Sequence, residues 1–147
     1  RCEIVVAMQD IPPTDRAWGL NGYLSALYGR PLLSTDLLYG LGYDWTSIER
    51  IGAEHLAAFT DQVVAGIQAQ YLAGDNGERL YHVVAQRYGL DGDEPLTVRQ
   101  LAEAMNVTPD RVRQIIARAL RRHRAPEQVA HLEEILRAAA DASLNEA

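Results

Sequence analysis

The side chains best suited to recognition chemistry lie near the start of a predicted helix over residues 109–123. At about 100° per residue, Asp110, Arg113 and Gln114 fall within one sector of this helix. Arginine suits the O6 and N7 atoms of guanine, glutamine suits the N6 and N7 atoms of adenine, and a carboxylate accepts from N4 of cytosine. The opposite sector is apolar and contains Val112, Ile115, Ile116 and Ala119. The pattern predicts a helix that buries one side and offers its first turns to base edges in a major groove.

The residues before this helix predict how it is held. Thr97 and Gln100 have the spacing of a capping box, which begins a helix over 97–105. Asn106 suits the left-handed backbone of a tight corner, and Thr108 is a preferred N-cap for the next helix. Two short helices joined by three residues make a helix-turn-helix.

Positive charge is concentrated around this motif, although the whole chain has a formal charge of −6 and contains no lysine. Residues 79–124 hold 9 arginines against 5 acidic residues, a balance of +4, whereas residues 1–78 hold 4 arginines against 10 acidic residues, a balance of −6. An arginine-rich segment between acidic flanks offers a polyanion one preferred docking place. The arginines beside the base-facing sector suit phosphate groups, and they are Arg111, Arg118, Arg121 and Arg122. The alternative is a helix that packs in a bundle and turns its polar face to water.

Several blocks of residues resemble region four of bacterial primary sigma factors in sequence, order and spacing. The blocks are 87–92 (RYGLDG), 94–97 (EPLT), 111–115 (RVRQI) and 117–122 (ARALRR), and the likeness runs from about Glu78 to Arg124. In that family this domain binds the −35 promoter element through its recognition helix and docks on the flap of the RNA polymerase β subunit. The resemblance therefore implies double-stranded promoter DNA and the RNA polymerase core as partners.

The resemblance also implies roles for single residues. Base contacts are expected from Asp110, Arg113 and Gln114. Contacts with the DNA backbone are expected from Arg99 and Arg111, and the further DNA-binding residues are Thr108 and Arg118. The residues expected to face the polymerase are Arg121, Arg122 and Ile116. For the arginines at 118, 121 and 122, the resemblance leaves a position near the polymerase and a more distant phosphate as alternatives.

The segment departs from the family pattern where the recognition helix begins. Thr108-Pro109-Asp110 stands where the family usually has Ser-Arg-Glu, so Pro109 replaces an arginine that contacts DNA, and Asp110 is shorter than the expected glutamate. Losing one bidentate base contact is expected to weaken discrimination between DNA sequences by about tenfold or more. Ile116 stands where the family tends to be acidic, and His123 stands where an apolar residue is common.

Helical periodicity also dominates the rest of the sequence, which predicts an all-α chain with, at most, a short N-terminal strand. We expect a helical domain of unknown role over residues 1–74, and a sigma region-four-like helix-turn-helix domain with a C-terminal amphipathic helix over 75–147. That last helix, near 127–140, either covers the core of its own domain or binds a partner chain. The other helices are expected around 18–28, 61–73 and 80–88, with a short turn near 36–38 and a helix capped by Asp44 or Thr46 that carries Ile48, Ile51, Leu56 and Phe59.

One stretch of the N-terminal half loosely resembles a second DNA-binding device. Residues 48–56 are similar to the turn of helix-hairpin-helix modules and of the C-terminal domain of the RNA polymerase α subunit, with Gly52 as the residue that would allow close approach of the backbone. The alternative is an ordinary glycine in a helix–helix turn.

The composition argues against catalysis, metal binding and a membrane span. The histidines are far apart and Cys2 is the single cysteine, so neither a zinc site nor an internal disulfide is expected. Without lysine, the phosphate-binding loop of the Gly-x-x-x-x-Gly-Lys type is excluded, and no apolar run approaches the ~20 residues of a membrane-spanning helix. We expect no enzyme activity, no cofactor, and a cytoplasmic, nucleoid-associated location in a bacterial or phage-infected cell. A chain that starts with Arg1 suggests a fragment or a processed start.

Three functions are compatible with these residues. The leading one is a DNA-binding transcription module that also contacts RNA polymerase. The second is a protein-interaction module that occupies the polymerase or another partner without reading bases, which the net acidity and Pro109 favour. The third is a DNA-targeting domain of a longer enzyme.

Overall fold

Helices account for all regular secondary structure in the part of the chain that the computed structural model describes, residues 15–145. They are α2 (Arg16–Tyr28), α3 (Asp36–Gly40), α4 (Trp45–Glu54), α5 (Leu56–Leu72), α6 (Gly77–Tyr88), α7 (Val98–Met105), α8 (Pro109–His123) and α9 (Pro126–Leu144). The predicted all-α fold is confirmed. The expected N-terminal strand and Cys2 lie outside the described residues.

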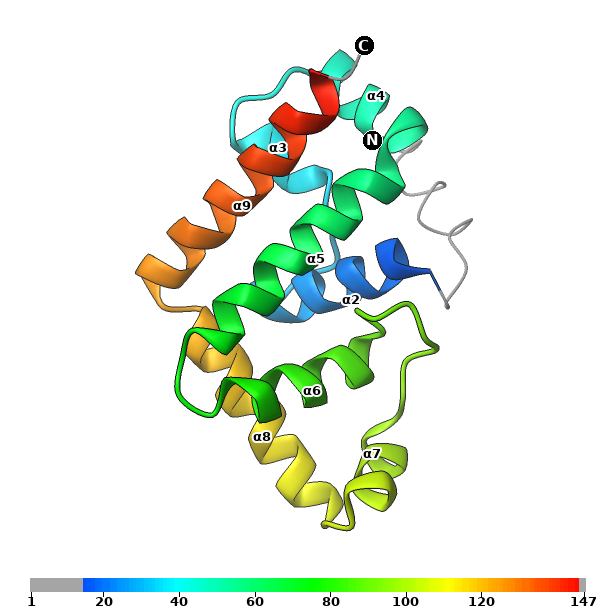
Figure 1. Ribbon diagram of the computed structural model, residues 1–147, viewed down its shortest axis with the longest axis vertical. Coiled ribbons are helices and arrows are strands. Elements are labelled where there is room, and N and C mark those ends of the chain that lie inside the picture. Colours follow the sequence, from blue (N-terminus) through cyan, green and yellow to red (C-terminus); the bar gives the residue numbers. More distant parts are fainter. Residues whose placement is uncertain (1–14, 146–147) are drawn as a thin grey trace.

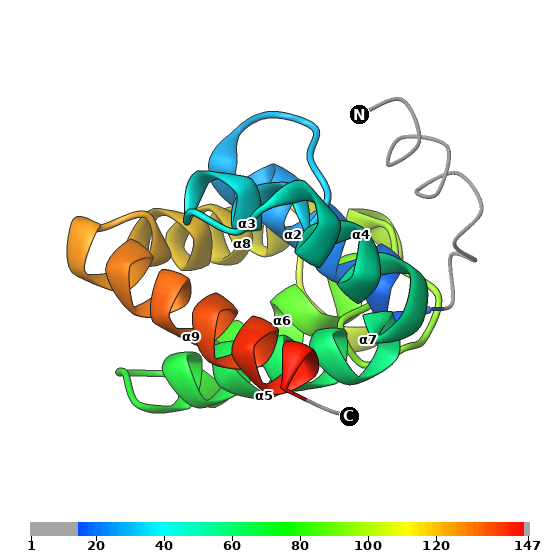
Figure 2. The same cartoon turned by 90° about the horizontal axis from the view of Figure 1, so that it is seen from above.

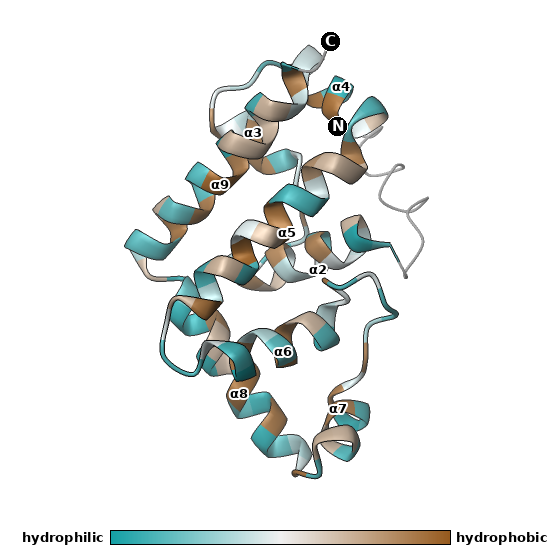
Figure 3. Ribbon diagram, viewed as in Figure 1, coloured by the Kyte–Doolittle hydropathy of each residue, from teal (hydrophilic) through white to brown (hydrophobic). Residues whose placement is uncertain are grey.

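The helices form an elongated arrangement with different elements at its two ends (Figure 1). The first turns of α8 lie with α7 at one end, and α3, α4 and the C-terminal end of α9 lie at the other. Along the body, α5 and α9 run side by side in both views (Figures 1 and 2), and their contact is the most extensive in the molecule. Hydrophilic residues follow the outer sides of α8 and α9 (Figure 3). The helix-turn-helix therefore projects from a body to which both halves of the chain contribute.

Local signals begin and end several helices as the sequence predicts. The Asp44 carboxylate accepts a hydrogen bond from the backbone N–H of Ser47 at 2.8 Å and begins α4. Gly29 and Gly89 end α2 and α6 with φ angles of 74° and 83°, left-handed conformations that glycine adopts at little cost. These helix limits are properties of the local sequence.

The boundary between α4 and α5 differs from the expected one. The helix ends at Glu54, the backbone turns at His55, and α5 begins at Leu56 instead of residue 61. Phe59, which we expected on the earlier helix, lies on α5 and continues its buried stripe one turn upstream. Gly52 lies inside α4, where an added Cβ would meet no atom within 4 Å. The expected turn at Gly52, with or without phosphate contact, is therefore wrong.

The C-terminal helix α9 is longer than expected and covers the chain's own core. Its buried residues pack mainly on α5, with further contacts to α4 and α3, and they include Leu132, Leu136, Ala139 and Ala140. The Gln70 side chain of α5 donates a hydrogen bond to the carbonyl oxygen of Gln128 at 2.9 Å. The core that α9 covers belongs largely to the N-terminal half and not to the helix-turn-helix.

The buried apolar residues form one cluster that crosses the expected domain boundary at residue 74. Helix α2 packs on α6 and α8 so closely that a Cβ added at Gly19 would lie 2.3 Å from the carbonyl oxygen of Gly89. Within the cluster, the hydroxyl groups of Tyr23 and Tyr71 are hydrogen-bonded at 2.8 Å. The expected boundary coincides with the turn between α5 and α6, and the division into domains 1–74 and 75–147 stays a prediction.

Candidate nucleic-acid interface

The corner between α7 and α8 has the geometry of a helix-turn-helix. The Thr97 hydroxyl accepts from the backbone N–H of Gln100 at 3.0 Å, and the Gln100 side chain accepts from the backbone N–H of Thr97 at 2.8 Å, which completes the predicted capping box. Asn106 adopts the left-handed conformation with φ of 57°. The Thr108 hydroxyl accepts from the backbone N–H of Arg111 at 3.1 Å and begins α8. The predicted limits of the second helix, 109–123, are confirmed.

Helix α8 buries one side and exposes the other, as its periodicity predicts. Val112, Ile115 and Ala119 are buried, and Ile116 is half-buried. Two further buried residues, Leu120 and His123, widen this face toward the body of the molecule. The residues that the sequence singles out for base contacts are exposed, and they are Asp110, Arg113 and Gln114. The first turns of α8 are therefore accessible to a partner.

Two polar contacts order the exposed side chains of α8. Arg113 donates through Nη1 to Oδ1 of Asp110 at 2.8 Å, and Arg111 donates through Nη1 to Oε1 of Gln114 at 3.5 Å. The side chains of Arg113 and Asp110 remain 62% and 86% exposed. Such exposed pairs contribute little stability, about 0–1 kcal/mol, so a nucleobase can replace either contact at small cost.

The arginines at the flanks of this surface are exposed. The side chains of Arg99 on α7 and Arg118 on α8 make no hydrogen bond or ion pair with the part of the chain that the structure describes. Arg121 is likewise exposed and points away from the buried side of α8. These guanidinium groups keep their full donor capacity for an anionic partner.

Other arginines of the same segment hold the fold together. Arg122, which the sequence places near a partner, donates through Nη1 to the backbone oxygen of Asp75, and its guanidinium fills the space that a Cβ at Gly74 would need. Arg124 donates to the carbonyl oxygens of Leu27 and Ala26 at 2.9 and 2.8 Å and so caps the C-terminal end of α2. Both contacts join residues far apart in sequence, so local sequence patterns do not predict them.

His123 connects the last turn of α8 to the N-terminal half. Its ring stacks on Tyr71 with centroids 3.8 Å apart, its Nδ1 lies 3.2 Å from the carbonyl oxygen of Ala119, and only 2% of the residue is exposed. Burial lowers the pKa of His123, and the neighbouring Arg122 lowers it further, while the Ala119 carbonyl acts in the opposite direction. The sequence marks His123 only as a departure from the family pattern, whereas the structure shows it as a stacking residue.

A groove of about 570 Å³ runs beside α8, next to its exposed first turns. Ile116, Leu120 and Arg121 line it from α8, and Tyr88 and Val98 line it from the other side. Arg87, Arg113 and Arg124 also border it, so the groove combines an apolar floor with positive charge. The sequence predicts the individual residues on α8 but not the groove, because its second wall comes from α6 and the start of α7.

Neither a membrane-spanning helix nor a metal-binding cluster is found among residues 15–145. No helix among them is long and apolar enough to cross a membrane. Within the same range, no group of three or more histidine, cysteine or acidic side chains is arranged to hold a metal ion.

Comparison with known proteins points to one segment. The sequence model of the sigma-70 region 4 family matches residues 78–125. Over 55 residues the chain is 42% identical to RNA polymerase sigma factor SigA of Nostoc sp., a stretch that covers 37% of this chain and 14% of that relative. The same identity and coverage hold for SigA1 of Synechococcus elongatus, and SigA of Microcystis aeruginosa is matched over 13% of its length.

The matched stretch spans about one seventh of the length of these relatives. No solved structure matches the chain. The matched residues, 78–125, hold nearly all of α6, the whole of α7 and α8, and the exposed arginines described above. Residues 78–125 of this chain are therefore similar to region 4 of sigma-70 factors, and they contain the helix-turn-helix formed by α7 and α8.

Proposed function

We propose that the chain binds promoter DNA by placing the first turns of α8 in the major groove. The observation that carries this proposal is the exposure of Asp110, Arg113 and Gln114 on a helix whose opposite side is buried. In this arrangement Arg113 donates to guanine, Gln114 pairs with adenine and Asp110 accepts from cytosine. The module acts by binding, without catalysis and without a cofactor.

The proposed phosphate contacts lie on both sides of these bases. Arg99 on α7 and Arg111 and Arg118 on α8 are exposed cations that can neutralise phosphates and fix the register of the helix. Thr108 contributes in another way, because its hydroxyl already accepts from the N–H of Arg111 and therefore fixes the start of the helix. Each phosphate contact raises the salt dependence of binding by about one counterion.

The proposed base preference differs from that of a typical region 4 at the start of the helix. Pro109 supplies neither a guanidinium nor an N–H group, so this position adds no base contact. The hydrogen bond between Asp110 and Arg113 holds the guanidinium beside the carboxylate. We expect the two residues to read adjacent positions as a pair, and the −35 element typical of the family to be bound with reduced discrimination.

Selection of bound duplexes from a random DNA pool tests the proposal with the full chain. The double variant Arg113→Ala/Gln114→Ala should lose sequence preference and keep its melting temperature, because both side chains are exposed. The matched control is Arg79→Ala, which removes an exposed arginine of α6 away from the turn. Unchanged selectivity of the double variant would contradict base reading by these residues.

A second candidate function is docking on RNA polymerase, which the groove beside α8 favours. Two residues expected to face the polymerase, Ile116 and Arg121, line this groove together with Leu120 and Tyr88. An apolar floor rimmed by arginines suits an acidic amphipathic segment of a partner. Arg122 contributes less to such a contact, because it already donates to Asp75. The β flap is the docking place that the resemblance to sigma factors implies.

Retention of polymerase core by the immobilised chain tests this docking. Arg121→Glu should weaken retention, whereas Arg79→Glu, with the same charge change outside the groove, should retain the core as the unaltered chain does. Retention of the core without sequence-selective DNA binding would favour the interaction module over the promoter reader. Equal retention by both variants would remove the groove as the docking surface.

A further inference from the structure

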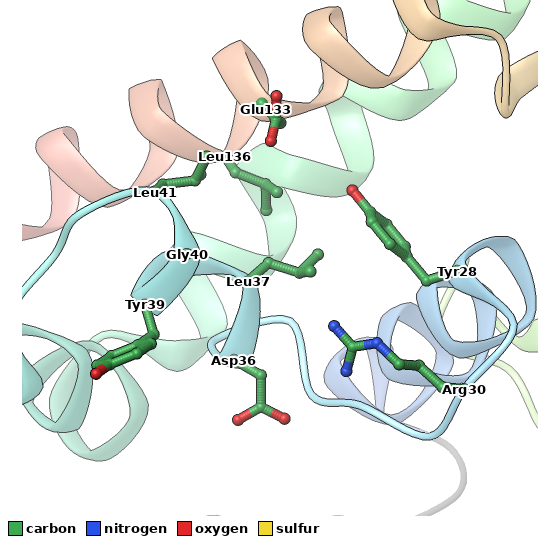
Figure 4. A pocket seen from close by; sticks show the side chains of 9 residues that line it. All are labelled: Tyr28, Arg30, Asp36, Leu37, Tyr39, Gly40, Leu41, Glu133 and Leu136. Carbon is green, nitrogen blue, oxygen red and sulfur yellow. The ribbon is translucent and has the colours of Figure 1, made fainter.

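A separate pocket of about 260 Å³ lies in the half of the molecule that contains α3, where the C-terminal end of α2, helix α3 and helix α9 meet. Figure 4 shows the side chains of Tyr28 and Arg30 reaching toward Leu37 and Leu136, with Glu133 on α9 nearby. The region 4 segment supplies none of these residues, because all of them lie outside 78–125. The pocket is therefore independent of the DNA-binding surface.

Two opposite charges face the same small space in this pocket. The side chains of Arg30 and Glu133 make no hydrogen bond or ion pair within residues 15–145. In Figure 4 the Tyr28 hydroxyl lies between the two charged side chains. Burial raises the pKa of Tyr28, the charge of Glu133 raises it further, and the charge of Arg30 lowers it. One donor cation and one acceptor anion thus line the pocket, on either side of the Tyr28 hydroxyl in Figure 4.

The third charged residue of the lining does not take part. The Asp36 carboxylate accepts a hydrogen bond from the backbone N–H of Leu33 at 2.9 Å, and Figure 4 shows it pointing away from Arg30 and Tyr28. The charges that face the cavity therefore balance. A phosphorylated ligand would meet a single arginine beside a carboxylate, and a simple cation would meet the arginine, so a ligand with both charges fits better than either.

The remaining lining is aliphatic. Leu37, Leu41 and Leu136 form an apolar surface beside the charged pair. A branched aliphatic side chain can cover this surface and gain from its removal from water. The volume of about 260 Å³ is sufficient for a ligand of that size, with room left for solvent at the mouth.

We propose that this pocket binds a small zwitterion, an α-amino acid with an aliphatic side chain. Its carboxylate accepts from Arg30 and the Tyr28 hydroxyl, its ammonium group donates to Glu133, and its side chain lies against Leu37 and Leu136. Such a ligand joins α2 and α3 to α9, which continues from α8 after a short connection at Arg124. The ligand therefore stabilises the packing that holds the last turn of α8.

Isothermal titration calorimetry of the full chain with L-leucine, L-isoleucine, L-valine and L-methionine tests the proposal without DNA. At least one of these amino acids should bind saturably and raise the melting temperature, because a ligand of the folded state stabilises it. For L-leucine, the matched probes are L-leucinamide, which lacks the carboxylate, and 4-methylpentanoate, which lacks the ammonium group. Each should bind about tenfold more weakly or worse, because each loses a charge-assisted hydrogen bond.

Variants at the two charges locate the site. Arg30→Gln and Glu133→Gln should each weaken amino acid binding by about tenfold. Glu134→Gln is the matched control, because Glu134 is the exposed neighbour on α9 that does not line the pocket. The melting temperatures of the unliganded variants show that they fold. Absence of binding by all four amino acids, equal binding of the amide or the acid, or unchanged binding by both pocket variants would overturn the proposal.

Discussion

The two ends of α8 use similar residues in opposite ways. At its first turns, the side chains of Arg111 and Arg113 hydrogen-bond to polar neighbours on their own helix and remain exposed. At its last turn, Arg122 contacts the turn between α5 and α6, and His123 stacks on Tyr71 of α5. Arg124 follows directly and caps α2. Position in the fold, and not residue type, therefore decides which arginines of this segment remain available to a partner.

This arrangement fixes α8 at its last turn, the held end, and leaves its first turns exposed, the presented end. The held end is fixed by packing and hydrogen bonds to α2, α5 and the turn before α6. The presented end carries side chains whose contacts are exposed and weak. A binding surface built on a rigid element keeps its geometry more accurately than one built on a loop.

Gly19→Ala should disrupt the packing of α2 on α6. The added Cβ would lie 2.3 Å from the carbonyl oxygen of Gly89, so α2 must move away from α6. We expect the free energy of unfolding, measured with urea, to fall by about 3 kcal/mol. The control is Gly22→Ala, whose Cβ would lie 3.8 Å from the Tyr88 ring and should leave stability unchanged or raise it by about 1 kcal/mol. Equal stability of the two variants would show that α2 does not pack closely against the C-terminal end of α6.

Arg124→Ala should lower stability without changing DNA sequence preference, and Arg113→Ala should do the reverse. Loss of the two hydrogen bonds to α2 should lower the free energy of unfolding by about 1 kcal/mol and leave the DNA sequence preference as it was. Loss of Arg113 should change stability by less than about 0.5 kcal/mol. The same loss should reduce discrimination between DNA sequences by about tenfold. Urea unfolding and fluorescence anisotropy with labelled duplexes measure the two effects, and the reverse assignment would refute the contrast.

Acidic pH should lower the free energy of unfolding through protonation of His123, which packs the last turn of α8 on Tyr71. The pKa of His123 in the folded chain lies below the ordinary value of 6.5. As the pH falls, the unfolded chain therefore binds more protons at this residue than the folded chain does, and folding becomes less favourable. The free energy of unfolding should be highest above pH 6.5 and decrease as the pH falls through and below that value. His123→Phe, which can keep a ring stacked on Tyr71, should remove this part of the pH dependence.

The control for this experiment is His82→Gln, because His82 is exposed on α6. It should retain the pH dependence of the unaltered chain in urea unfolding at a series of pH values. If His123→Phe and the unaltered chain lose stability equally between neutral pH and pH 5, the buried imidazole is not the responsible group.

The smallest stability effect is expected at the presented end, from the pair of Asp110 and Arg113. A double-mutant cycle with Asp110→Ala and Arg113→Ala should give a coupling below about 0.5 kcal/mol in unfolding, because both side chains are exposed. In DNA binding, Asp110→Ala should alter the preferred base at one position by freeing the Arg113 guanidinium. A large coupling in stability would place this pair in the structural framework instead of the recognition surface.

Much of the helix-turn-helix followed from the sequence because its determinants are local. The capping box at Thr97, the left-handed Asn106 and the cap at Thr108 each involve residues within about four positions of one another. The buried and exposed sides of α8 follow from helical periodicity, which needs only the order of apolar and polar residues. The likeness to sigma region four rests on the same stretch, and the family match to residues 78–125 confirms it.

The sequence did not predict helix limits that lack a capping or breaking residue, or contacts between residues far apart in the chain. The break at His55 is marked by neither glycine nor proline, and burial of Phe59 in the core decides where α5 begins. The packing of α9 on α5 was also not predicted. Helical periodicity identifies the apolar face of a helix, but it does not identify the surface on which that face packs.

The sequence alone determined the turn, the two faces of α8 and the family likeness of the segment around them. Only the tertiary structure decided that Arg122 and Arg124 serve the fold, that His123 meets Tyr71, and that Arg30 and Glu133 face one pocket. The physical reason is the distance along the chain. A hydrogen bond within one helical turn is available wherever the two residues occur, whereas contacts across 47 to 98 residues exist only after the whole core has packed.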